Sequence, residues 1–143
     1  MKRRNRWDSP ADESATQLEE EVMRPTDTWI CVADGARAQF YRCDGPGRGV
    51  DPIVNLVLVS PARHHDHREQ ARFAGRVASQ LDDAATNNLF ERLVLVAPSG
   101  MLGALRHTLN AHTRRLVCGE VDKDLTRATP RELATHIGDK LPH

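Results

Sequence analysis

The sequence predicts one α/β domain in three layers, with a five-stranded mixed sheet in the strand order 3-2-1-4-5 and helices on both faces. Two observations predict this class. The first half of the chain holds three strand-like apolar runs separated by short turn signals, which is typical of an antiparallel meander. The second half alternates strand-like and helical patterns, which is typical of parallel strands joined by helical crossovers. The length of 143 residues fits a single domain.

The meander is expected over residues 28–33, 36–42 and 52–60. Asp34-Gly35 is a turn signal between the first two strands, and Pro61 ends the third. Because right-handed crossovers connect the last two strands, each of them must lie parallel to a neighbour. The simplest arrangement pairs the first strand with the fourth.

The second half begins with a long helix expected over residues 67–85, where the apolar residues fall on one stripe. The continuous apolar run 93–97 is typical of a central parallel strand. Ser99 is the expected cap of the next helix, which buries Leu102, Leu105 and Leu109. A fifth strand is expected over residues 116–121. Thr129-Pro130-Arg131-Glu132 is a capping box, so a last helix is expected to run to Ile137.

Residues 1–26 are expected to form a flexible charged arm, and residues 27–143 the folded domain. The arm has a basic head, residues 2–6, and an acidic stretch, residues 8–21. Such segments bury too little apolar surface to offset the entropy lost on ordering. A short helix over residues 14–23 is the alternative, because Leu18 and Val22 would share a face.

Composition limits the class of function. The chain has 20 basic and 20 acidic residues, which argues against a bulk polyanion binder but allows a local basic stripe. No apolar run approaches the ~20 residues of a membrane span, and no secretory signal is recognisable. A cytoplasmic protein without membrane contact is expected. The odd count of three cysteines favours reduced thiols; Cys31 and Cys118 are expected to be buried in strands, and Cys43 to be exposed.

Four blocks carry a resemblance over roughly residues 28–137: WICVADGARAQFY, ARFAGRVASQL, LFERLVLVAPSGMLGALR and EVDKDLT. They resemble the bacterial host attachment protein family. That family is similar to the central domain of archaeal and eukaryotic peptide-chain release factors and of the ribosome-rescue factor Pelota, which have a ribonuclease-H-like sheet. The family name implies attachment to host cells, whereas the fold resemblance implies work on the ribosome. The matching motif residues are Asp34, Gly35, Arg37, Lys123, Asp124 and Thr126, and we expect them to be structural: a turn, backbone hydrogen bonds and an ion pair of Lys123 with Asp124.

Release factors place a Gly-Gly-Gln loop between the third strand and the long helix. Here the corresponding residues 61–70 contain no glycine, so the backbone geometry of that loop is not accessible. We therefore expect no peptide release and no catalytic residues.

A positive ridge is the expected site for structured RNA or a protein partner. Arg68, Arg72 and Arg76 repeat every four residues and so share one face of the long helix, with Glu69 able to pair with Arg72. The loop before the helix adds further donors: Arg63, His64, His65 and His67. A solvated helix face is the alternative for the arginines. For the histidines the alternatives are a loop that gains charge near pH 6.5 or an exposed polar loop.

Neither a metal site nor a cofactor is expected. The histidines and Asp66 have suitable donor atoms, but adjacent side chains in an extended loop point in opposite directions. A metal-dependent nuclease would need several converging carboxylates, for which Asp34, Asp122 and Asp124 are the candidates. The first strand carries no acid in its middle, however, and the fourth ends in Ala97-Pro98. Three hypotheses remain: a ribosome- or RNA-associated binding module, a host-attachment or partner-binding protein, and an enzyme.

Overall fold

The computed structural model describes residues 26–45, 49–61 and 66–141. Its sheet contains β1 (Thr26–Ala33), β2 (Arg37–Cys43), β3 (Asp51–Val59), β4 (Phe90–Ala97) and β5 (Val117–Asp122) in the order β3-β2-β1-β4-β5. β1 is antiparallel to β2 and β2 to β3, whereas β1–β4 and β4–β5 are parallel. The predicted α/β class, a mixed sheet flanked by helices, is confirmed.

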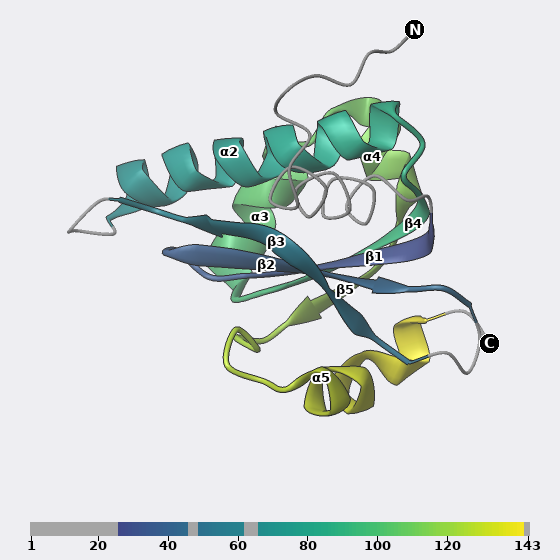
Figure 1. Cartoon of the computed structure of the whole chain (residues 1–143). Helices are drawn as coiled ribbons and strands as arrows, with labels where there is room; N and C mark the ends of the chain where they lie inside the picture. Colours follow the sequence, from purple (N-terminus) through teal and green to yellow (C-terminus); the bar gives the residue numbers. More distant parts are fainter. Residues whose placement is uncertain (1–25, 46–48, 62–65, 142–143) are drawn as a thin grey trace, which may run out of the picture.

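The helices lie on both faces of the sheet (Figure 1). One face carries α2 (His67–Thr86), α3 (Ser99–Thr108) and α4 (Ala111–Leu116). The other carries α5 (Pro130–Ile137), which continues into the short 3-10 helix η1 (Gly138–Lys140). Among the described residues, no helix is long and apolar enough to cross a membrane.

Alternation along β1 creates two cores. Trp29, Cys31 and Ala33 face the larger cluster under α2 and α3, whereas Ile30 and Val32 face the smaller cluster under α5. This follows from the two-residue period of a strand, which sends successive side chains to opposite faces. β1 and β4 are buried over most of their length because they lie at the centre of the sheet.

Two local expectations need correction. Ser99 does not cap α3: the cap position is Pro98, and no side chain accepts a hydrogen bond there. The chain also forms a separate helix, α4, before β5. Its cap is Asn110, whose side chain accepts from the Thr113 backbone N–H. Thr113 Oγ1 donates to Asp82 of α2 at 2.6 Å, which fixes α4 against α2. This contact joins residues far apart in sequence, so local periodicity does not reveal it.

Candidate functional site

The site expected from the sequence starts where α2 begins. Asp66 is the helix cap, with its Oδ1 accepting from the Glu69 backbone N–H at 3.0 Å. A carboxylate here satisfies a helix N–H group and complements the positive end of the helix dipole. His67 is the first helical residue and is exposed. The other loop residues of the predicted ridge, Arg63, His64 and His65, lie outside the described residues.

Three arginines form one exposed face of α2, which we call the arginine face: Arg68, Arg72 and Arg76. The opposite stripe of the helix, which includes Phe73, is buried. Arg72 pairs with Glu69 at 3.0 Å, and its side chain is still 65% exposed. Exposed ion pairs of this kind contribute roughly 0–1 kcal/mol, so the Arg72 guanidinium remains available to another anion.

Arg76 also connects α2 to the sheet. Its Nη1 donates to the backbone carbonyl of Val59 at 3.0 Å, and its guanidinium lies over the Phe73 ring, 5.5 Å from the centroid. The sequence did not predict either contact. Since β3 is an edge strand, the Val59 carbonyl has no neighbouring strand on that side, and Arg76 satisfies it.

A groove, called here the α2–β3 groove, separates the arginine face from β3. Its first part has a volume of about 650 Å³, with Val59, Ser60, Pro61, Glu69, Arg72, Phe73 and Arg76 as its lining. Its second part, about 480 Å³, continues along α2 over Leu58. The groove therefore combines an apolar strand on one side with guanidinium groups on the other.

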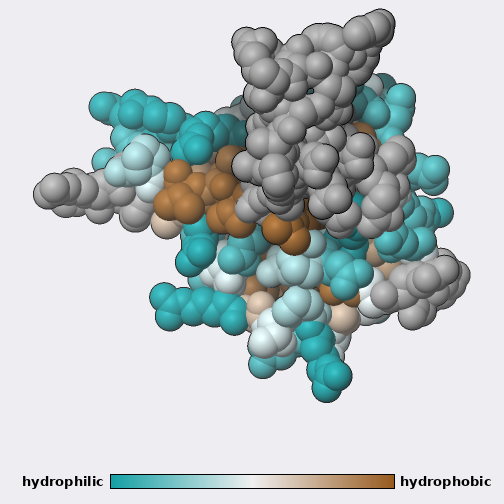
Figure 2. Space-filling model, in the orientation of Figure 1, coloured by the Kyte–Doolittle hydropathy of each residue, from teal (hydrophilic) through white to brown (hydrophobic). Residues whose placement is uncertain are grey.

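β3 exposes large hydrophobic side chains, which the sequence patterns did not lead us to expect. Val54, Val57 and Val59 are each about half exposed. Figure 2 shows hydrophobic surface along β3 next to the hydrophilic surface of α2. The signal was present in the sequence, because residues 53–59 are apolar at nearly every position instead of alternating. The strand is apolar on both faces, and Ile53, Leu56 and Leu58 pack against the main core while the three valines do not.

The family-motif residues form a hydrogen-bonded cluster at the carboxyl edge of the sheet. Asp34 Oδ1 accepts from the backbone N–H groups of Ala36 and Arg37, closing the turn that contains Gly35. Thr126 Oγ1 lies 2.7 Å from an Asp124 carboxylate oxygen and 3.3 Å from one of Asp34. These contacts hold the segment after β5 against the turn after β1. Asp34 and Asp124 thus have protein partners.

Lys123 forms no ion pair with Asp124, contrary to expectation. Its Nζ lies 3.4 Å from His136 Nδ1 instead, because Asp124 turns back toward Thr126. Asp122 is exposed. Within the described ranges, no three His, Cys, Asp or Glu side chains lie together in a way that could hold a metal ion.

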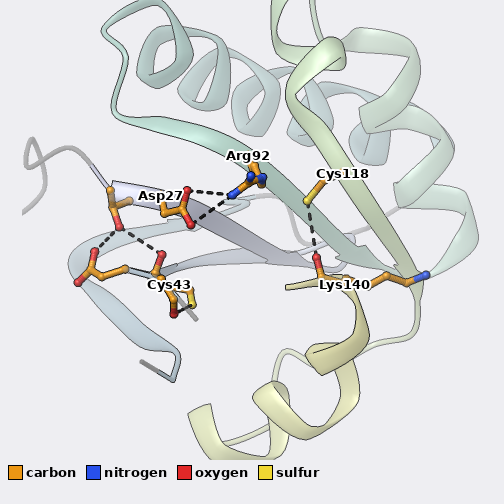
Figure 3. Close-up of polar contacts among 8 residues, drawn as sticks. Asp27, Cys43, Arg92, Cys118 and Lys140 are labelled. Atoms are coloured by element: carbon orange, nitrogen blue, oxygen red, sulfur yellow. Dashed lines mark hydrogen bonds and ion pairs between the residues drawn. The ribbon is translucent and has the colours of Figure 1, made fainter. Parts of the chain in front are cut away.

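The exposure of two cysteines is the reverse of the prediction. Cys43 is buried and donates to the Gly45 carbonyl, whereas Cys118 is exposed and contacts the Lys140 carbonyl at 3.7 Å (Figure 3). β5 is the other edge strand, so its side chains are less covered than those of a central strand. Partial desolvation of its thiol raises the pKa of Cys118, and full burial raises the pKa of Cys31 to about 12. Neither of these two thiols has the lowered pKa typical of a nucleophile.

Figure 3 also shows how the amino end of the sheet is held together. Arg92 of β4 donates to both carboxylate oxygens of Asp27 at 3.0 and 3.3 Å. Thr26 contacts the Cys43 carbonyl and the Asp44 side chain. These polar contacts connect β1 to both of its neighbours and have a structural role.

Comparisons with known proteins give a family and a fold. A family model described as "Protein required for attachment to host cells" matches residues 57–137. Among solved structures, an archaeal translation termination factor, aRF1, is similar with a TM-score of 0.55 and 10% identity over 85% of this chain. The S. cerevisiae protein Dom34, described as a translation termination-like factor that interacts with Hbs1, gives a TM-score of 0.46 and 7% identity over 92% of this chain. This chain covers 37% of the aRF1 chain and 41% of the Dom34 chain. No curated protein matches the sequence significantly.

Proposed function

The chain belongs to the family of proteins required for attachment to host cells, and from this premise we propose that it is a non-catalytic binding module that associates with ribosomes or structured RNA. The observation that carries the proposal is the arginine face. Three exposed guanidinium groups follow one side of a 20-residue helix on a chain whose net charge is zero. Guanidinium groups in such a row can neutralise backbone phosphates of structured RNA, which proteins recognise largely through shape and phosphate contacts.

The fold supports the same proposal. The chain resembles part of an archaeal translation termination factor, and we assign it to the central-domain type of that class. In the proposed mode of action the α2 side of the domain meets RNA, while the hydrolytic loop of release factors is missing from residues 61–70. A ribosome-associated role would place the protein in the cytoplasm.

The proposal includes no catalysis. The acidic cluster at the carboxyl edge is the strongest alternative, but Asp34 and Asp124 direct carboxylate oxygens to Thr126 and to backbone N–H groups. Two-metal nucleases need carboxylates that converge on the ions instead. We therefore assign these residues to the turn that supports the sheet edge.

Co-sedimentation with ribosomes across a salt series tests the proposal. We expect Arg68→Ala/Arg72→Ala to flatten the dependence of log K on log salt by up to about 1.4–1.8 units, because each arginine neutralises about one phosphate. Arg76 is left unchanged because it also holds Val59. The matched control is Arg114→Ala/Arg115→Ala, which removes two exposed arginines from α4. Equal binding of the parent and the Arg68/Arg72 variant at every salt concentration would refute the site.

A partner-binding protein, in the sense of the family name, is the second candidate. The exposed valines of β3 favour it, because an apolar edge strand is a ready template for a protein partner. The same assay separates the two candidates. A protein that binds only protein partners off the ribosome stays in the supernatant at every salt concentration, and its behaviour does not change with the arginine substitutions.

A further inference from the structure

β3 is an outer strand of the sheet, and within residues 26–45, 49–61 and 66–141 no strand pairs with its outer edge. The opposite outer strand, β5, is shielded by η1: a Cβ added at Gly119 would lie 2.9 Å from the Cβ of Lys140. At the carboxyl half of β3, in contrast, Val57 and Val59 are about half exposed. Edge strands are usually shortened, charged or covered, so an exposed apolar edge is typical of a strand that receives a partner.

The hydrogen bonds of β3 show which of its backbone groups point outward. The Ser60 N–H donates across to the turn before β2 at 2.7 Å, so Ser60 faces inward. Backbone groups alternate in direction along an antiparallel strand, so those of Leu58 face β2, and those of Val57 and Val59 point away from the sheet. The Val59 carbonyl agrees with this, because it accepts from Arg76 of α2. The outer edge therefore offers the N–H and C=O groups of Val57 and the N–H of Val59.

The side chains of the same residues alternate between the two faces of the sheet. Leu58 packs against the main core on the α2 face, so Val57 and Val59 lie on the opposite face. Directly opposite residues of paired strands point the same way. A strand added to this edge would therefore place two side chains beside the valines and the side chain between them over Leu58. The first two positions favour apolar side chains, which form cross-strand pairs with the valines.

The α2–β3 groove determines the position between them. Leu58, Arg72 and Arg76 line its second part, so a side chain over Leu58 enters between the strand and two guanidinium groups. Both arginines are exposed. Glu69 and Asp83 also line the groove, but they precede and follow the arginines along α2, and Glu69 is already paired with Arg72. A carboxylate is therefore the complement of the middle of the groove.

Arg76 is held in an orientation that suits this role. The Val59 carbonyl and the Phe73 ring fix its guanidinium group. The hydrogen bond to Val59 uses one nitrogen, and a guanidinium carries several further N–H donors. These donors can bind a carboxylate with little additional loss of side-chain entropy, because the group is already ordered.

We propose that β3 receives an extended segment of a protein partner as an additional antiparallel strand, with the pattern apolar–acidic–apolar opposite Val57, Leu58 and Val59. The acidic side chain binds Arg72 and Arg76 in the α2–β3 groove, and the apolar side chains extend the valine surface. Main-chain hydrogen bonds to a sheet edge, combined with pockets for alternate side chains, are a general mode of peptide recognition. The proposal rests on the second candidate function, partner binding, and not on RNA binding.

The first test uses the full chain and a fluorescent, capped heptapeptide with Val-Glu-Val at its centre and threonines on both sides. One control peptide has both valines N-methylated, which removes the donors to β3 and keeps the side chains. The other has glutamine in place of glutamate. Fluorescence anisotropy should show that N-methylation weakens binding about tenfold or more, since hydrogen bonds are lost, and that glutamine weakens it about fivefold, since the charge is lost.

The second test locates the peptide on the edge. Hydrogen exchange of the free protein should be fast at the amides of Val57 and Val59 and slow at Leu58, and the peptide should slow the first two. Val57→Pro removes an outward N–H without removing a β2–β3 hydrogen bond, so it should abolish binding, whereas Val57→Thr retains the N–H and should bind. Protection of residues 93–97 of β4 shows that each variant is folded.

Equal affinity for the parent and N-methylated peptides overturns the proposal, as does unchanged exchange at Val57 and Val59. These two measurements use the unaltered protein and decide the matter even if Val57→Pro does not fold. Exchange in the free protein that slows with protein concentration also overturns it, because a second copy then occupies the edge. So does slowing of the same amides by RNA and not by the peptide. The Arg68→Ala/Arg72→Ala ribosome assay is separate, so the RNA proposal and this one fail independently.

Discussion

At the scale of single residues, burial decides the chemistry of the thiols. Cys31 lies in the central strand with no exposed surface, and Cys43 is almost as deeply buried. Cys118 lies on the edge strand β5 and is exposed. Two strand positions with the same amino acid, Cys31 and Cys118, thus differ because one strand has neighbours on both sides and the other does not.

Thiol labelling of the native protein should therefore modify Cys118 alone. Because burial raises its pKa above the ordinary value, we expect the rate at neutral pH to be lower than that of an unstructured peptide thiol, and to rise as the pH increases. Counting labelled sites by mass spectrometry checks this, with Cys118→Ser as the control that abolishes labelling. Native labelling of Cys43 would contradict the prediction.

The stability of the fold should depend on the ionisation of Cys31. Its pKa is about 12 in the folded protein, against 9.0 for an ordinary exposed thiol, so folding favours the neutral form. The contribution of the neutral thiol to the free energy of unfolding is fully present below pH 9. It is lost as the pH rises from there toward the folded-state pKa, at up to about 1.4 kcal/mol per pH unit. Urea denaturation at several pH values should show a shallower alkaline decline for Cys31→Ala than for the parent. Equal slopes would contradict the assignment.

At the scale of elements, the start of α2 depends on one side chain. Asp66 accepts from the Glu69 N–H and leads into the arginine face, where like charges repel each other. The Asp66 carboxylate therefore lies at the end of α2 that carries the exposed arginines. Glu69 offsets part of the same repulsion through its ion pair with Arg72.

Asp66→Ala should lower the free energy of unfolding by roughly 0.5–2 kcal/mol, because a helix N–H group loses its acceptor. Asp66→Asn should retain most of the stability, since the amide oxygen can still accept. Chemical denaturation of the three proteins measures the difference. If Asn is as destabilising as Ala, the charge and not the hydrogen bond is responsible.

At the scale of the whole molecule, the two sides of the domain differ in character. The central strands β1 and β4 join the meander to the crossover half, and the two cores fix the helices on both faces. The α2–β3 side combines the exposed cations, the groove and the apolar edge strand. The carboxyl edge instead holds hydrogen bonds that support the turns.

We expect the protein not to release peptide from stalled ribosomes. Residues 61–70, which include the connection from β3 to α2 and the first turn of α2, contain no glycine, and Gln70 is within α2. Without glycine, this segment cannot adopt the backbone geometry of a Gly-Gly-Gln loop. A codon-independent release assay with purified protein checks this, with an active release factor as the positive control. Peptide release above the buffer level would contradict the non-catalytic assignment.

Local sequence patterns were enough to predict the five strands and the helices α2, α3 and α5 in their order, but not α4. Turn chemistry at Asp34-Gly35, the capping box at Thr129 and the helical stripe of α2 are local patterns, and the structure contains all three. The pairing of β1 with β4 followed from the handedness of crossover connections. The ion pair of Glu69 with Arg72 was also predictable, because neighbouring turns of a helix bring such side chains together.

Which of these residues are covered depends on the tertiary structure. Val57 is exposed and Arg42 buried, although hydropathy favours the opposite, because burial depends on strand position and on what packs across each face. For the same reason Cys43 is buried and Cys118 is exposed, which is the reverse of what the sequence predicted. The contact of Arg76 with Val59 exists only because α2 crosses beside an edge strand. A local pattern fixes the direction of a side chain relative to its own element, whereas its neighbours come from segments distant in the chain.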